Sequence, residues 1–280
     1  PGVPGRKGDA LGGAGNAPAG SLRGLAADPG PERLQLGLDA LVAAVDVVHA
    51  LDQGRALGRL RNRADTLALA AVVGATVLFF GTSMSAGKTT SARIVTHMFK
   101  SAGHRVVGAK LSGAGRYKDI LALKDVGARA IYDFVDVGLP SSICEEGLYR
   151  ERLAQLLSRV AAVKADVAVI EIGASPLEPY NGSIAIEALN HNVKFSVLSA
   201  SDPYAVHGLI DAFGMKPDLV TGVASNTLAG IDLVEKLSGV RAVNFLNPKN
   251  GAFLRDVLGK ATGMNLKKRN HAESERRRNP

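Results

Sequence analysis

The sequence predicts an α/β fold in which helices cover both faces of a mostly parallel β-sheet. Three observations indicate this fold. Short apolar runs alternate with helical patterns through most of the 280-residue chain, which is the order found in parallel sheets. Several runs are nearly continuous in Val, Ile and Phe, as in strands that are buried on both faces. A glycine-rich stretch after the first run has the composition of a phosphate-binding loop.

The chain before the predicted sheet falls into two parts. Residues 1–31 are crowded with Gly, Pro and Ala, and we expect them to be disordered. Residues 32–72 are expected to form a helical N-terminal segment, because Leu34, Leu38 and Leu41 fall near helical spacing. This segment could be the remnant of an upstream domain.

The predicted nucleotide-binding domain covers residues 73–262 and begins with an apolar run. No charged residue occurs between Asp65 and Lys88, a span that could cross a bilayer. However, the second part of the span is rich in Gly, Ser and Thr, and Val77–Phe80 is typical of a buried strand. We therefore predict a strand here and no membrane segment.

The stretch Gly81–Thr90 follows this strand directly. Its glycines would let backbone N–H groups turn inward around a polyphosphate, Lys88 would reach the outer phosphates, and the Thr89 hydroxyl would coordinate magnesium. Five residues separate Gly81 from Gly87, one more than in the common pattern. The alternative is a small-residue loop that matches Gly-Lys-Thr by accident. The predicted nucleotide-binding residues here are Gly81, Thr82, Ser85, Ala86, Gly87, Lys88, Thr89 and Thr90.

A helix is predicted after this loop. Ala92, Val95 and Phe99 fall near helical spacing, and Gly103 can end the helix in a left-handed conformation. The positive end of the helix dipole then points at the phosphates.

Six further apolar runs complete the predicted sheet. In parallel sheets ligands bind beyond the carboxyl ends of the strands, so functional side chains are expected at or just after the ends of the runs. The runs are Val106–Ala109, Ile131–Val135, Val167–Ile172, Phe195–Ser199, Leu219–Val223 and Ala242–Leu246.

Ionisable residues occur at or after these ends. Glu171 interrupts a buried apolar strand, which costs solvation free energy unless a cation meets it. Thr89, Asp119 and Glu171 form a chemically sensible set for Mg²⁺, which takes oxygen ligands and one or two carboxylates. Lys110 follows the second strand, where it could contact an anionic substrate or a phosphate being transferred. We predict Lys88 and Lys110 to be catalytic.

Three of these residues, Glu171, Asp119 and Lys110, also have a purely structural interpretation. Glu171 could be a strand-end residue that reaches solvent or a structural lysine. Asp119 could stabilise the start of a helix through the helix dipole. Lys110 could be a surface lysine at a strand end.

The charge of the chain is concentrated at its end. The formal net charge is +8, and the part from Leu266 onward has six basic and two acidic residues, a net charge of +4. Residues 263–280 are therefore expected to form a basic, disordered tail, although such a tail could contact nucleic acid or an anionic membrane. We expect no nucleic-acid partner, because no aromatic residue is interleaved to stack on bases. Cys144 is the only cysteine, which fits a reduced, cytoplasmic protein.

The motifs resemble those of the dethiobiotin synthetase group of P-loop proteins. The similarity covers roughly residues 75–250 and includes the five-residue spacing of the loop. It continues through Gly108-Ala109-Lys110, the stretch Asp119–Leu123, Pro140-Ser141-Ser142, Val169-Ile170-Glu171 and Gly222–Asn226.

The resemblance implies a P-loop NTPase fold that binds ATP and magnesium. It implies that Lys110 lies near the reacting group of the substrate and that Asn226 recognises the nucleotide base. It also implies a homodimer with substrate sites near the subunit interface. The residues that it implies for ATP and magnesium are Lys88, Thr89, Asp119 and Glu171.

The chain also departs from this group. Ser83, Met84 and Ser85 replace acidic positions of the dethiobiotin synthetase loop, and the segment Leu111–Lys118 is shorter than the substrate loop of that group. The biotin-pathway substrate is therefore not assigned. The chain looks similar, through Glu171–Pro176 and its phosphate loop, to an uncharacterised group that includes proteins linked to D-glutamate N-acetylation.

Three functions remain open on the sequence alone. The leading hypothesis is an ATP-dependent enzyme that activates a small carboxylate or carbamate by phosphoryl transfer, with Lys110 offsetting charge on the transferring group. The second is a nucleotide-dependent switch or adaptor. The third is an acyltransferase whose phosphate loop holds coenzyme A. The expected partners are a small anionic substrate and a second copy of the chain.

Overall fold

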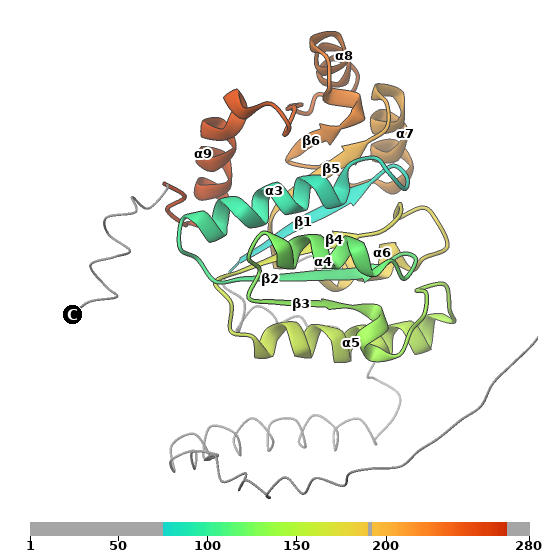
Figure 1. Ribbon diagram of the computed structural model, residues 1–280. Coiled ribbons are helices and arrows are strands. Elements are labelled where there is room, and N and C mark those ends of the chain that lie inside the picture. Colours follow the sequence, from blue (N-terminus) through green and yellow to red (C-terminus); the bar gives the residue numbers. More distant parts are fainter. Residues whose placement is uncertain (1–74, 190–191, 268–280) are drawn as a thin grey trace, which may run out of the picture. The chain divides into compact units, whose positions relative to one another are not determined.

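A computed structural model describes residues 75–189 and 192–267. Our predictions for residues 1–72 and for most of the basic tail lie outside these residues. The described part confirms an α/β fold, since every strand pairing in it is parallel and helices cover both faces of the sheet (Figure 1). Among the described residues, no helix is long and apolar enough to cross a membrane.

Six strands form the sheet in the order β3-β2-β4-β1-β5-β6. The strands are β1 (Ala75–Gly81), β2 (Val106–Ser112), β3 (Ala130–Asp133), β4 (Val167–Ile172), β5 (Val193–Ala200) and β6 (Leu219–Gly222). The α-helices are α3 (Lys88–Ser101), α4 (Tyr117–Asp125), α5 (Glu146–Ala162), α6 (Gly182–Leu189), α7 (Pro203–Phe213), α8 (Leu228–Ser238) and α9 (Gly251–Thr262). The short 3₁₀ helices are η1 (Phe134–Val137), η2 (Val223–Ser225) and η3 (Pro248–Asn250).

The first strand lies in the middle of the sheet. β1 pairs with β4 on one side and with β5 on the other, and all seven of its residues are buried. Its near-continuous apolar sequence fits a position that is covered from both faces. The loop that follows β1 therefore starts from a strand that is buried along its whole length.

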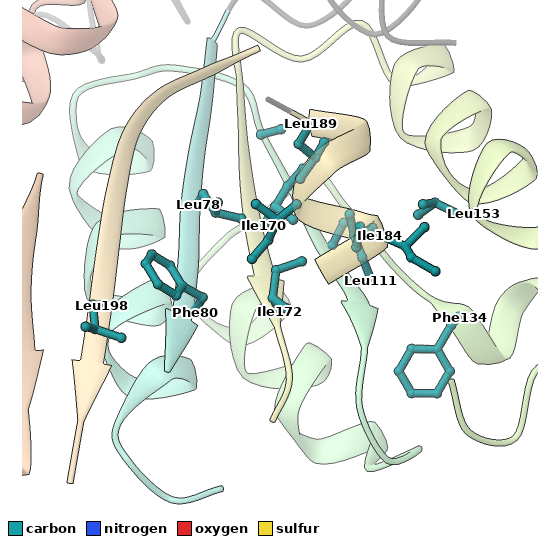
Figure 2. Packing of buried hydrophobic residues seen from close by; sticks show 14 of the residues in the cluster. Leu78, Phe80, Leu111, Phe134, Leu153, Ile170, Ile172, Ile184, Leu189 and Leu198 are labelled. Atoms are coloured by element: carbon teal, nitrogen blue, oxygen red, sulfur yellow. The ribbon is translucent and has the colours of Figure 1, made fainter. Parts of the chain in front are cut away.

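Two apolar cores lie on opposite faces of the sheet, because successive side chains of a strand point to opposite faces. One core joins Leu78, Ile170 and other strand residues to α5, α6, α7 and α8. Figure 2 shows part of this core, including Leu78, Ile170 and Leu153 of α5. The other joins Phe79, Val169 and their neighbours to α3, α4 and α9. Lys110 and Glu171 share the second face, because they have the same strand parity as Val106 and Val169, which belong to that core.

The predicted strand at Ala242–Leu246 is wrong. Only an isolated parallel bridge between Val220 and Ala242 forms there. The Asn244 side chain accepts a hydrogen bond from the backbone N–H of Leu246, and η3 begins two residues later. This local hydrogen bond offers the backbone an alternative to the sheet, so the chain turns away after one bridge.

The predicted run Ile131–Val135 is also shorter in the structure, because β3 ends at Asp133. The Asp133 carboxylate accepts a hydrogen bond from the N–H of Val135, and the Asp136 carboxylate accepts one from the N–H of Asp133. This reciprocal pair starts η1 and so ends the strand.

The helix predicted after the phosphate loop is confirmed. α3 buries Ala92, Val95 and Phe99 against the sheet. Gly103 follows its end with a φ of 90°, the left-handed conformation expected of a glycine at this position.

Candidate functional site

The phosphate loop between β1 and α3 has a backbone that few residues adopt. Ser85 and Gly87 have φ values of 63° and 108°, both in the left-handed region. A non-glycine residue in this region is strained, and such strain persists where the surrounding structure holds it. Gly87 also lies close to Gly222, since a Cβ added at Gly87 would lie 3.2 Å from the Gly222 Cα atom. The loop is thus held in its turned form by the end of β6.

The N-terminus of α3 has no side-chain cap. Gly87 is the residue before the helix and supplies no side-chain cap, and the first turn has no acidic residue. The first N–H groups of a helix lack intrahelical partners and form the positive end of the helix dipole. An anion such as phosphate can therefore bind at this helix start.

Lys88 begins α3 and is buried, with 6% of its surface exposed. Its Nζ donates a 2.7 Å hydrogen bond to the backbone carbonyl of Ser83 within the loop. Burial lowers the pKa of the Lys88 ammonium below its ordinary value, whereas the charge of Glu171 opposes this shift. The lysine therefore lies folded across its own loop, where an anion could replace the carbonyl as its partner.

Thr89 and Glu171 are in direct contact. The Thr89 hydroxyl lies 3.1 Å from Oε1 and 2.9 Å from Oε2 of the Glu171 carboxylate. Glu171 is 3% exposed, and burial raises its pKa above the ordinary value even though Lys110 and Lys88 lower it. The structure thus brings together two of the three residues predicted to hold magnesium.

Lys110 lies beside Glu171 in the sheet, since the two residues are partners in the register of β2 and β4. Lys110 is 4% exposed, which excludes the interpretation of a surface lysine. Its Nζ lies 2.7 Å from Oδ2 of Asp119, in the first turn of α4, and donates a 3.2 Å hydrogen bond to the carbonyl of Ala114. Asp119 therefore pairs with Lys110 here, rather than with Thr89.

A cavity of about 210 Å³ opens between the phosphate loop and the segment that joins β2 to α4. Most of the predicted site residues meet there: Ser85, Gly87, Lys88, Thr89, Thr90, Lys110, Asp119 and Glu171. The cavity is also lined by Met84, Gly113, Ala114, Arg116, Lys118, Gly173 and Ala174. We call this space the main cavity.

A second cavity, also of about 210 Å³, shares Ser85, Gly87 and Thr90 with the main cavity. Asn226, which follows η2, contributes to its lining, as do Asn244 and Leu246. None of the described residues that line it is charged. We call it the amide cavity, because two asparagines border it.

Three predicted binding residues line neither cavity. Gly81 is the last residue of β1, and a Cβ there would lie 2.8 Å from the Ser199 carbonyl and 2.9 Å from Lys88 Cδ. The Thr82 hydroxyl accepts a 3.1 Å hydrogen bond from the N–H of Ser201, and Ala86 is buried. The structure places these residues where they shape the loop.

Sequence reasoning did not single out several residues of the two cavities. Arg116 and Lys118 had a visible signal, because they immediately precede Asp119 in the segment after β2. Asn244 was not identified because it lies within the incorrectly predicted strand Ala242–Leu246. Gly222 stood in a quoted motif, but only the structure shows that it supports the loop.

The order strand, phosphate loop, helix within a parallel sheet is that of a P-loop NTPase fold, as predicted. No protein-family model and no curated protein matches the chain.

Solved structures similar to the chain include three with 15% sequence identity each. The signal recognition particle receptor FtsY from Elizabethkingia anophelis has a TM-score of 0.42, with 65% of this chain and 63% of the receptor covered, so the chain spans less than two thirds of its length. The hydrogenase maturation factor HypB from Archaeoglobus fulgidus has a TM-score of 0.47, with 73% of this chain and 100% of HypB covered. A ParA family ATPase from Chlorobium tepidum has a TM-score of 0.38, with 68% and 91% covered. At this identity the likeness concerns the fold alone.

Proposed function

We propose that the chain binds ATP with magnesium and transfers the terminal phosphoryl group to a small carboxylate or carbamate. The observation that carries this proposal is the contact between Thr89 and the buried carboxylate of Glu171, beside Lys88 at a helix N-terminus. Hydroxyl, carboxylate, lysine and free helix N–H groups are the parts that P-loop enzymes assemble around a nucleotide.

The residues present fit a magnesium ion. Mg²⁺ prefers hard oxygen ligands and takes one or two carboxylates together with phosphates and waters. The Thr89 hydroxyl and the Glu171 carboxylate provide such oxygens at 2.9 and 3.1 Å from one another, and Asp119 offers a second carboxylate in the same cavity. Bound there, the ion would neutralise charge on the phosphate oxygens.

The protein groups have separate roles in the proposed reaction. The loop N–H groups and Lys88 bind the phosphates, and Lys110 offsets negative charge on the group being transferred. One carboxylate oxygen of the acceptor forms a bond to the terminal phosphorus while the bond from that phosphorus to the bridging oxygen breaks. The products are an acyl phosphate and ADP, with no redox partner.

The amide cavity is the proposed site of the base and ribose. It joins the main cavity at Ser85, Gly87 and Thr90, so a nucleotide with its phosphates at the loop would extend into it. The side chain of Asn226 forms no hydrogen bond with another described residue, which leaves its amide for a base. We propose a purine nucleotide, with adenine as the base.

A nucleotide-dependent switch is the second candidate function. Two large apolar side chains are exposed beside the main cavity, Met84 at 55% and Tyr117 at 67%. Met84 lines the cavity, and Tyr117 lies in the chain between Arg116 and Lys118, which also line it. A macromolecular partner that covered these side chains would sense the nucleotide directly.

The first experiment is calorimetric titration of ATP with magnesium into the protein and into Lys88→Ala. We expect binding that requires magnesium and that is lost in the variant, because a buried cation is removed from the phosphates. Lys236→Ala, on the exposed surface of α8 and outside both cavities, is the matched control and should bind normally. No ATP binding, or displacement by coenzyme A, would move the proposal to acyl transfer.

Turnover separates the enzyme from the switch. ADP release is measured with a panel of small carboxylates, and Lys110→Ala should lower it by about 100-fold or more, as for the loss of one preorganised donor. A rate of ADP release that does not change with any of the carboxylates but increases when a macromolecule is added would instead support the switch.

A further inference from the structure

Two cations of the main cavity have no acidic partner among the described residues. The side chains of Arg116 and Lys118 line the cavity, yet neither forms a hydrogen bond or an ion pair with any described residue. Lys110, in the same lining, is paired with Asp119 at 2.7 Å, and Lys88 is bonded to a loop carbonyl. Unpaired cations that border a polar cavity indicate an anionic ligand.

The charges of the lining indicate which anion. Four cations face two carboxylates, Asp119 and Glu171, in the main cavity. A magnesium ion held by both carboxylates would cancel their charge, so all four cations would remain for the phosphates. Lys88 belongs to the loop itself and Lys110 to β2. Arg116 and Lys118 would then add positive charge for the third phosphate of a triphosphate.

The segment that bears these two cations is fixed at both ends. The Ser142 hydroxyl accepts a 2.7 Å hydrogen bond from the N–H of Gly113, and the N–H of Ser142 donates to the carbonyl of Gly113 at 3.1 Å. At the other end, α4 buries Ile120 and Leu123 in the core on one face of the sheet. Arg116 and Lys118 are exposed between these anchors, so their side chains can turn toward a ligand while the backbone stays in place.

We propose that Arg116 and Lys118 bind the terminal phosphoryl group of the nucleotide and thereby distinguish a triphosphate from a diphosphate. The guanidinium of Arg116 presents paired N–H donors that match phosphate oxygens, and Lys118 adds a point charge. This inference rests on the proposed nucleotide site, but it holds whether the chain is an enzyme or a switch. The segment between β2 and α4, together with the first turn of α4, is then the part of the chain that senses the state of the nucleotide.

The test compares two nucleotides by calorimetry in the presence of magnesium: ADP and the non-hydrolysable imido analogue of ATP. Arg116→Gln and Lys118→Gln should each lower the affinity for the analogue by about 10-fold or more, which is the effect of losing one charged hydrogen bond. The affinity for ADP should change by no more than about 2-fold. Lys236→Gln, outside both cavities, should change neither affinity. Melting temperatures without nucleotide confirm that each variant is folded.

The outcomes separate this inference from the proposed function. If the protein binds neither nucleotide, or if Lys88→Ala binds as well as the natural sequence, the nucleotide site itself is wrong. If both nucleotides bind but Arg116→Gln and Lys118→Gln weaken them equally or not at all, recognition of the terminal phosphoryl group by these cations is overturned. Variants that leave the analogue unchanged but raise the KM for a carboxylate would assign the two cations to the acceptor instead.

Discussion

At the scale of single residues, the phosphate loop depends on a glycine that is remote in sequence. Gly222, the last residue of β6, has a φ of 94°, and a Cβ there would collide with the carbonyl oxygen of Ala86 in the loop. It would also lie 2.8 Å from the Ala200 carbonyl. Neither the φ value nor the space permits another residue, so Gly222 is as much a part of the loop as Gly87.

Replacement of this glycine should affect stability and binding together. We expect Gly222→Ala to lower the free energy of unfolding by about 1–3 kcal/mol or more, the cost of a strained backbone with an added collision. The same variant should weaken ATP binding, because the loop must shift. Urea unfolding and calorimetry measure the two effects.

Two other glycines serve as controls: Gly208, which lies within α7, and Gly214, which follows the end of α7. Gly214 has a φ of 73° and nothing within 4 Å of an added Cβ, so Gly214→Ala isolates the backbone cost. Gly208 is within α7 with open space around it, and Gly208→Ala should stabilise the protein by roughly 0.5–1 kcal/mol. If Gly222→Ala behaves like Gly214→Ala in both measurements, the contact with the loop has no role.

At the scale of elements, β3 and η1 illustrate how a buried acid can end a strand. Asp133 is 4% exposed and caps η1 through the N–H of Val135. Burial raises the pKa of its carboxyl group above the ordinary value, and the nearby charge of Asp136 acts in the same direction. The hydrogen bond from Val135 favours the charged form of the carboxyl group, but the effect of burial is larger.

The raised pKa of Asp133 predicts a pH dependence of stability with a defined sign. Because this pKa is higher in the folded than in the unfolded protein, the contribution of Asp133 to stability is greatest at low pH and falls as the pH rises through the folded value. Asp133→Asn keeps an acceptor for Val135 and has no such fall. Between about pH 4 and pH 8, urea unfolding should therefore show that the free energy of unfolding of the variant rises relative to that of the natural sequence. A constant difference would contradict the prediction.

Much of the fold could be predicted from the sequence, because strands that are buried on both faces appear as continuous apolar runs, as in Val77–Phe80. Lys110 and Glu171 could be placed at strand ends, but their pairing depends on the register of β2 and β4. Asn244 ends a strand-like run through one hydrogen bond from the backbone to its side chain. Strand propensities do not take such local hydrogen bonds into account. Arg116 was missed because an exposed cation in a loop is ordinary until a cavity is seen beside it.

At the scale of the whole molecule, the proposed nucleotide would contact elements that come from distant parts of the sequence. The main cavity takes residues from the loop after β1 and from α3, β2, α4 and β4, and the amide cavity adds β6 and the chain around Asn244. A ligand that spans both cavities therefore binds the folded protein and not the unfolded chain. Its binding free energy adds directly to the stability of the whole domain.

We expect ATP with magnesium, at about 100 times its dissociation constant, to add about 2.7 kcal/mol to the free energy of unfolding. For a domain of this size the melting temperature should rise by roughly 5–10 °C. Differential scanning fluorimetry measures the shift, and Lys88→Ala should show almost none. An equal shift without magnesium would argue against the metal ligands proposed here.

The position of β1 in the sheet has a consequence for synthesis of the chain on the ribosome. β1 and its loop are made first among the described strands, yet β1 pairs only with β4 and β5, which begin at Val167 and Val193. In a nascent chain that ends before β4, β1 has no strand to pair with among those described. The loop after β1 then also lacks its contact with Gly222 of β6. Formation of the sheet must wait for contacts between distant parts of the sequence, which slows folding. A nucleotide that binds as proposed could therefore stabilise the fold only late in synthesis, after most of the domain has left the ribosome.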